Sequence, residues 1–185
     1  MKIINWEEFQ KNEPLIGSSM EKTSMTVGIF DGVHRGHQVL IKKIVSYNKN
    51  YLPAVITFRQ NHKTAGNEQK DIQTFQQRLL MLENLGIKLT VVVDFTETFM
   101  EMPGFEFLEI LLKYGNVGFF AAGSDFRCGR ALDTNASIIK TFFNSRNIPV
   151  EILPNVMEGS QPVSSSRIRK AIADNDITLA QTMLK

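Results

Sequence analysis

The strongest constraint on the fold is the alternation of short apolar segments with amphipathic ones along the chain. The apolar segments are mostly hydrophobic along their whole length, which is the pattern of strands buried on both faces. A parallel sheet covered by helices on both sides provides that burial. We therefore predict one doubly wound, Rossmann-like α/β domain over residues 1–185, with about five parallel strands. The predicted strands are Met25–Phe30, Ala54–Phe58, Leu89–Phe95, Val117–Ala122 and Val150–Leu153.

The segments between these strands have helical spacing. In the first, Leu40, Ile41 and Ile44 share one face and polar residues lie opposite. The second begins with a capping-box pattern at Thr74 and ends at Gly86. Further helices are predicted over Phe105–Tyr114, around 138–143, and over Ser165–Ala173 and Asp176–Leu184.

Composition narrows the classes of function. The 185 residues are 43% hydrophobic and 22% charged, which suits a globular protein. The formal net charge is +2 and the basic residues are scattered, so nucleic acid is not an expected partner. A small anionic ligand is compatible with this charge. The sequence has no membrane span and no signal peptide pattern, and Cys128 is its single cysteine. These features predict a cytoplasmic protein without a membrane partner.

The loop after the first predicted strand has the strongest functional signal. In doubly wound sheets, ligands bind beyond the carboxyl ends of the strands, where the strand order reverses. The segment Thr26–His37 contains two of the three histidines and three glycines that allow a ligand or another backbone segment to approach closely. We expect His37 to begin a helix, where free backbone N–H groups favour phosphate. The alternative is a tight turn whose histidines only cap that helix.

A second candidate lies near the C-terminus, in the segment Val163–Arg169. Three serines stand at a predicted helix start and two arginines follow within one turn. Hydroxyl, guanidinium and free backbone N–H groups suit the phosphates of a nucleotide. The alternative is a capped helix with solvated arginines.

Together these two motifs resemble the HxGH nucleotidyltransferase superfamily. The longer set of matches resembles bacterial FAD synthetases, the FMN adenylyltransferase module of bifunctional riboflavin kinase/FAD synthetases. The matching segments are Gly28–Gln38, Val55–Phe58, Ala122–Arg127 and Val163–Arg169. The resemblance implies transfer of AMP from ATP to FMN, which yields FAD and pyrophosphate, with Mg²⁺ as cofactor.

The resemblance also implies roles for individual residues. The histidines would hold the triphosphate and stabilise charge at the α-phosphate, and the serine–arginine cluster would take the leaving phosphates. The implied catalytic residues are His34, His37, Ser165 and Arg169. The implied nucleotide-side residues are Gly28, Phe30, Asp31, Gly36, Ser164, Ser166 and Arg167. The implied acceptor-side residues are His62 and Asn135. Asp125 and Phe126 would belong to the nucleotide and flavin environment, and Phe58 is a further implied binding residue.

Two roles stay open on this basis. Asp31 either accepts a backbone hydrogen bond or holds Mg²⁺ through water, and no metal ligand is predicted. Phe126 either stacks on an aromatic ring or packs in the core. Cys128 is expected only to fill space, because phosphoryl transfer needs no thiol.

The chain departs from the family on the acceptor side. An acidic residue followed by Pro-His-Pro is usual after the second strand, whereas this chain has Arg59–Lys63 with His62 offset by one. The loop before Asn135 lacks the usual glycines. These departures leave two alternatives: a related nucleotidyltransferase with another phosphorylated acceptor, or a nucleotide- or flavin-binding protein that has lost turnover. No riboflavin kinase module is expected within residues 1–185.

Overall fold

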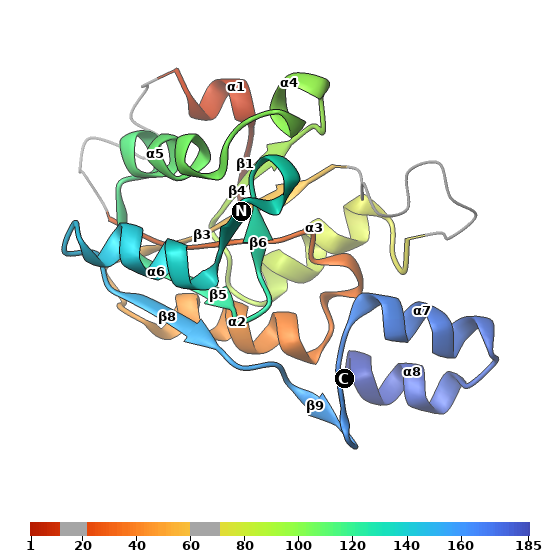
Figure 1. Ribbon diagram of the computed structural model, residues 1–185. Helices are drawn as coiled ribbons and strands as arrows, with labels where there is room; N and C mark the ends of the chain where they lie inside the picture. The colour runs from red at the N-terminus through yellow and green to blue at the C-terminus, as the bar shows by residue number, and fades with distance from the viewer. Residues whose placement is uncertain (12–21, 60–70) are drawn as a thin grey trace.

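The computed structural model describes residues 1–11, 22–59 and 71–185 and has a six-stranded parallel sheet at its centre (Figure 1). The strand order is β1-β4-β3-β2-β5-β8. The doubly wound α/β prediction is confirmed, with six strands in place of about five. The additional strand is β1, an edge strand in which Ile4 alone is buried, so it lacks the solid apolar pattern of the others. The strands are β1 (Lys2–Asn5), β2 (Thr23–Val27), β3 (Leu52–Phe58), β4 (Leu89–Val93), β5 (Val117–Gly123) and β8 (Val150–Leu153).

Helices cover both faces of this sheet, as Figure 1 shows. Helices α1 (Trp6–Phe9), α5 (Gly104–Gly115) and α6 (Ala136–Asn144) pack on one face, and α2 (Arg35–Ser46) and α3 (Phe75–Asn84) on the other. Successive strand residues alternate between these two apolar cores, because side chains along a strand point to opposite faces. The sheet is therefore buried on both sides.

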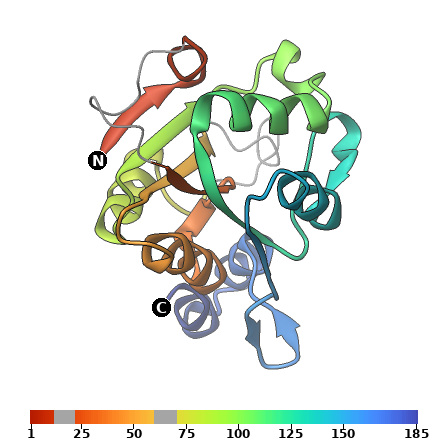
Figure 2. The same cartoon turned by 90° about the vertical axis from the view of Figure 1, so that its left-hand side faces the viewer.

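The C-terminal helices form a third, smaller apolar cluster. Helices α7 (Ser165–Ala173) and α8 (Ile177–Leu184) pack on each other around Ile168 and Met183. A short hairpin of β9 (Met157–Glu158) and β10 (Gln161–Pro162) leads into them. Figures 1 and 2 show the pair at one corner of the molecule, beside α2. This placement brings the start of α7 to the edge of the sheet.

Polar contacts attach these C-terminal helices to α2. The Gln38 side-chain amide donates to the Leu184 carbonyl at 2.8 Å. The guanidinium of Arg35 pairs with Glu158 at 2.5 Å and also donates to the Thr182 carbonyl at 3.3 Å.

The remaining short elements are η1 (Asp31–Val33), α4 (Glu97–Met100), β6 (Arg127–Cys128), η2 (Arg130–Leu132) and β7 (Thr134–Asn135). Within the described ranges, no helix is long and apolar enough to cross a membrane.

The turn between β6 and β7 has an uncommon backbone. Ala131 and Leu132 adopt left-handed conformations, with φ of 52° and 59°, although neither is glycine. Gly129 is left-handed as well, and a Cβ atom there would lie 2.3 Å from the backbone nitrogen of Gly104. The Asp133 carboxylate accepts from that same N–H at 3.1 Å. The turn is therefore pressed against the start of α5, and the alanine and leucine carry conformational strain.

We expect the Ala131→Gly substitution to stabilise the protein by about 0.5–1 kcal/mol. Glycine adopts the left-handed conformation of this position without the steric strain that alanine has there. The free energy gained exceeds the cost of the greater conformational entropy that glycine gives the unfolded chain. The measurement is urea unfolding followed by circular dichroism. Gly129→Ala is the matched change of opposite sign, because its methyl group would collide with the backbone of Gly104. A less stable Ala131→Gly variant would contradict this assignment of strain.

Candidate nucleotide-binding site

The candidate site lies at the point where the sheet reverses its winding direction. From β2 the chain continues to β3 and β4 on one side, and it later adds β5 and β8 on the other side. The loops that follow β2 and β5 therefore leave the sheet at neighbouring carboxyl ends, where such sheets bind their ligands. His34 and His37 follow β2, and Asp125 follows β5.

The two histidines form a stacked pair at the start of α2. Their ring centroids lie 3.6 Å apart with an angle of 18° between the planes. His34 is the N-cap residue, and its side chain accepts a hydrogen bond from the His37 N–H at 3.4 Å. The helix begins at Arg35, two residues before the predicted start at His37, because the His34 side chain supplies the cap. The pair thus lies at a helix N-terminus, where anions are favoured.

Burial keeps both imidazoles neutral near pH 7. It lowers the pKa of His34 to about 4, although the charge of Asp125 acts in the opposite direction. Burial also lowers the pKa of His37 well below its usual value, and the neighbouring His34 and Arg78 add to this effect. Because His34 accepts at Nδ1, its proton is on Nε2, from which it can donate to a phosphoryl oxygen.

Small residues allow this loop to close tightly. A Cβ atom at Gly36 would lie 3.2 Å from the His34 ring, and one at Gly28 would lie 3.0 Å from the Phe30 ring. Phe30 itself is fully buried, has a φ of 55°, and presents its ring to His37 at a centroid distance of 5.2 Å. These contacts restrict the orientation of the histidine pair.

The structure brings the serine–arginine cluster to the same loop. The Ser165 hydroxyl donates to the Asp31 carbonyl at 2.8 Å, across 134 positions of sequence. The Arg169 guanidinium pairs with the Asp31 carboxylate at 2.5 Å. Ser164 caps α7 by accepting from the Arg167 N–H at 3.2 Å. The first turn of α7 and the turn before α2 therefore lie together.

The Asp31 carboxylate is engaged through both of its oxygens. One oxygen accepts from the Ile72 backbone N–H at 3.0 Å, and the other receives Arg169. Burial raises the pKa of Asp31, and Asp71 adds to this, whereas the bonds from Ile72 and Arg169 act in the opposite direction. Among the described residues, no group of three or more acidic, histidine or cysteine side chains is placed to hold a metal ion. The described side chains therefore do not form a protein cage for Mg²⁺.

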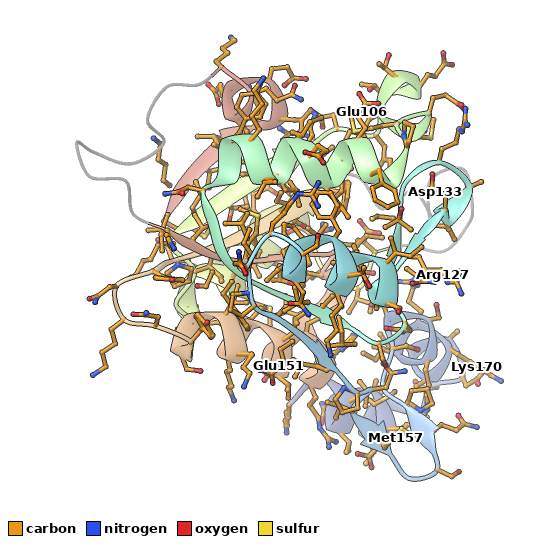
Figure 3. All side chains as sticks on the ribbon, turned by 60° about the vertical axis from the view of Figure 1, so that its left-hand side comes forward. Glu106, Arg127, Asp133, Glu151, Met157 and Lys170 are labelled. Carbon is orange, nitrogen blue, oxygen red and sulfur yellow. The ribbon has the colours of Figure 1, made fainter. Side chains whose placement is uncertain are left out.

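Two other members of the predicted cluster are placed differently. Arg167 donates to the carbonyls of Glu158, Gln161 and Pro162, so it braces the β9–β10 hairpin. Ser166 is exposed. Figure 3 shows Lys170 of α7 and Arg127 of β6 extending on the same side of the molecule.

The other predicted binding residues are only partly gathered around the histidines. Asp125 is exposed and its charge acts on His34. Phe126 packs against the main core, and Asn135 caps α6 by accepting from the Ile138 N–H at 3.1 Å. Phe58 is buried against Phe95, with ring centroids 4.4 Å apart. His62 lies outside the described residues.

Sequence reasoning gave no role to Arg78, a fully buried arginine next to the site. Its Nη1 donates to the Phe58 carbonyl at 2.7 Å, and its Nη2 lies 3.8 Å from the Asp71 carboxylate. The available signal was its spacing, because Arg78 shares the inner face of α3 with Leu82. A charged residue within an apolar stripe of a helix indicates a buried partner.

The comparisons with known proteins agree with this geometry. A family model for FAD synthetase matches residues 17–167. The chain belongs to the FAD synthetase family. The match includes the histidine loop and the serines of α7, and it ends two residues before Arg169.

Relatives of this FAD synthetase family member are bifunctional enzymes. It is 30% identical over 172 residues to a bifunctional riboflavin kinase/FMN adenylyltransferase of Buchnera aphidicola, with 88% of this chain and 54% of the relative aligned. It is 29% identical to the protein of the same description from Bacillus subtilis, with 92% and 55% aligned. The chain thus spans about half the length of these curated relatives.

Solved structures support the same fold. A crystal structure from Streptococcus pneumoniae, described as a macrolide-efflux protein, has a TM-score of 0.81 and 26% identity, and the match covers 100% of this chain and 61% of that one. A pantoate–β-alanine ligase from Francisella tularensis has a TM-score of 0.62 at 17% identity, with 100% and 78% covered, which supports the fold alone.

The buried histidine His34 predicts a specific loss of stability in mild acid. The unfolded chain takes up a proton near pH 6.5, whereas folded His34 does so only near pH 4, so its contribution is complete above pH 6.5 and is lost as the pH falls through 4. We expect a loss of about 2–3 kcal/mol from this residue. His34→Asn keeps an N-cap acceptor and cannot titrate, so its unfolding free energy should vary less with pH. Equal slopes in urea unfolding between pH 4 and 7.5 would contradict the prediction.

Proposed function

We propose that this protein is an FMN adenylyltransferase, which transfers AMP from ATP to FMN and yields FAD and pyrophosphate. One observation carries the proposal: α7 bonds through Ser165 and Arg169 to Asp31, in the turn that leads into the stacked histidines at the reversal point of the sheet. Membership of the FAD synthetase family names the substrates that such a site would take. We further propose that it works in the reducing cytosol, alone or within a longer enzyme.

The proposed reaction is a displacement at the α-phosphorus of ATP. A phosphate oxygen of FMN forms a bond to that phosphorus, the bond to the bridging oxygen of the β-phosphate breaks, and pyrophosphate leaves with the electron pair. This chemistry depends on positioning and on stabilising the charge that develops on oxygen, and it needs no covalent nucleophile. Nothing in it requires the thiol of Cys128, whose pKa burial raises to about 12.

The histidine pair would bind and polarise the triphosphate. As neutral imidazoles, His34 and His37 would donate hydrogen bonds to phosphoryl oxygens. The backbone N–H groups at the start of α2 add a favourable dipole. The negative charge of the bound triphosphate would then favour protonation of an imidazole, which supplies positive charge as the transferred phosphorus reacts.

The first turn of α7 would take the leaving phosphates. Ser165 and Ser166 present hydroxyl and backbone N–H groups there, and Arg169 stands one turn behind them. Arg169 pairs with Asp31, so a triphosphate would compete with that carboxylate for the guanidinium. Arg169 would thus exchange one anionic partner for another.

Mg²⁺ is implied by the family resemblance, and the described side chains do not form a cage for it. Mg²⁺ commonly binds to proteins through substrate phosphates and retains several waters. We therefore expect it to arrive with ATP, and we assign no step of the reaction to a metal held by the protein.

The acceptor side supports a second candidate, a nucleotidyltransferase that uses another phosphorylated acceptor. Its motivation is the sequence Arg59–Lys63, which stands where the family usually has an acidic residue and Pro-His-Pro. Pyrophosphate release should be measured with ATP or CTP and with FMN, riboflavin or no acceptor. Release that requires both ATP and FMN, with formation of FAD, supports the first candidate. Binding of ATP and FMN without release would indicate a binding protein.

We expect His37→Ala to reduce FAD formation by roughly 10²- to 10³-fold, the range found when one donor to a developing anionic charge is removed. FAD is measured by chromatography with ATP, FMN and Mg²⁺ in excess. Ile172→Ala is a matched control, since this exposed side chain of α7 lies outside the site. Near wild-type activity of His37→Ala would remove the imidazole from the mechanism.

A further inference from the structure

A buried arginine lies behind the histidine loop and has no assigned role. Arg78 is fully buried, and its Nε and Nη2 atoms have no hydrogen-bond partner among the described residues. A buried guanidinium with incomplete hydrogen bonding is costly, because desolvation of the charge is only partly repaid. Burial accordingly lowers the pKa of Arg78. A cost of this kind indicates a constraint other than stability.

The surroundings of Arg78 form a row of alternating charges. Arg169 of α7 pairs with Asp31, and Arg78 of α3 pairs with Asp71 at 3.8 Å. Arg78 and Asp31 also act on each other electrostatically: each stabilises the charged form of the other. The row therefore runs from α7, through the turn before α2, to the segment that enters α3.

Hydrogen bonds between side chains and backbone groups join the same row. The Ile72 N–H donates to Asp31, and the Gln73 side-chain amide donates to the Phe30 carbonyl at 3.3 Å. Arg78 donates to the carbonyl of Phe58, the last residue of β3. Residues 71–73 are therefore held against the turn that precedes His37. Arg78 joins these residues to the end of β3.

We propose that Arg78 is a positioning residue of the nucleotide site. It fixes residues 71–73 and the end of β3 against the turn Phe30–Asp31. This lock holds the histidine pair in its stacked geometry. Arg78 acts through Asp31 and Asp71 and does not touch the substrate. The proposal rests on the proposed function for the identity of the ligand, but the lock itself is a property of the free protein.

Several charged groups act on the histidine pair, and each bears on the test. From α3, Arg78 acts on His37; from the turn after β5, Asp125 acts on His34; and the two imidazoles act on each other. Removal of the Arg78 charge should therefore raise the pKa of His37. A merely structural residue elsewhere would not produce this shift.

The experiment compares Arg78→Met and Arg78→Lys with the control Arg146→Met. Arg146 also pairs with a carboxylate, that of Glu109 at 2.7 Å, and lies 3.8 Å from the ring centroid of Phe142, but it lies in the turn that follows α6, away from the candidate site. Three quantities are measured: kcat/KM for FAD formation, hydrogen exchange of the Ile72 amide, and NMR titration of the His37 ring.

We expect Arg78→Met to lower kcat/KM by roughly 10- to 100-fold, the effect of a small displacement of reacting groups. Exchange at Ile72 should become faster and the His37 titration should move to higher pH. Arg78→Lys keeps the charge but not the forked geometry, so it should retain the His37 titration and still show fast exchange. Arg146→Met should change none of the three quantities.

Other results would overturn the proposal. It fails if Arg78→Met leaves Ile72 exchange and the His37 titration at their wild-type values, or if Arg146→Met changes them equally. If Arg78→Met does not fold, Arg78→Lys and Asp71→Asn test the same lock, and unchanged Ile72 exchange in both would refute it. If the wild-type protein makes no FAD, the proposed function fails, while exchange and titration still decide the role of Arg78.

Discussion

The site depends on the interactions of one aspartate. The carbonyl of Asp31 accepts from Ser165 at the start of α7, and its carboxylate receives Arg169 from the same helix and the N–H of Ile72 from the segment before α3. Three parts of the chain that are distant in sequence are thereby fixed around the turn that carries the histidines. Because Asp31 is buried, these interactions act in a medium of low polarity, where loss of one partner leaves an uncompensated charge.

The electrostatics of the free site follow from this arrangement. The arginines near the turn already have carboxylate partners, and the stacked imidazoles are neutral because they are buried. The charge of Arg169 is therefore compensated where the triphosphate is proposed to bind, whereas that of the buried Arg78 behind it is compensated only in part. A triphosphate would bring several negative charges, and positive charge would be recruited by exchange of partners and by proton uptake. In the proposed mechanism, additional positive charge therefore develops at the site only when the triphosphate binds.

The sequence was sufficient to predict the doubly wound sheet, because strands that are hydrophobic along their whole length must be buried on both faces. It also singled out the turn after β2 and the start of α7, and the structure places these two segments together, bonded through Asp31. It missed β1, whose exposed edge position needs no apolar pattern. It placed the start of α2 two residues late because histidine is an uncommon cap.

The contacts of individual side chains were not predictable in the same way. Arg167 and Arg169 are two residues apart on one helix, yet one braces the hairpin and the other reaches Asp31. The rotation of α7 about its axis decides which of the two arginines faces Asp31, and tertiary packing sets that rotation. The role of Arg78 was hidden for the same reason, since its partners come from segments on either side of α3.

The separate apolar cluster of α7 and α8 has a consequence for how activity is lost. None of its buried members comes from the six-stranded sheet, and polar bonds to α2 and to Asp31 hold it in place. Partial unfolding confined to this corner would remove the serines of the proposed phosphate site while the sheet remained intact. Mild heat or denaturant should therefore disrupt the proposed nucleotide site before the bulk of the secondary structure melts. If ATP binds there as proposed, it should make the two transitions coincide.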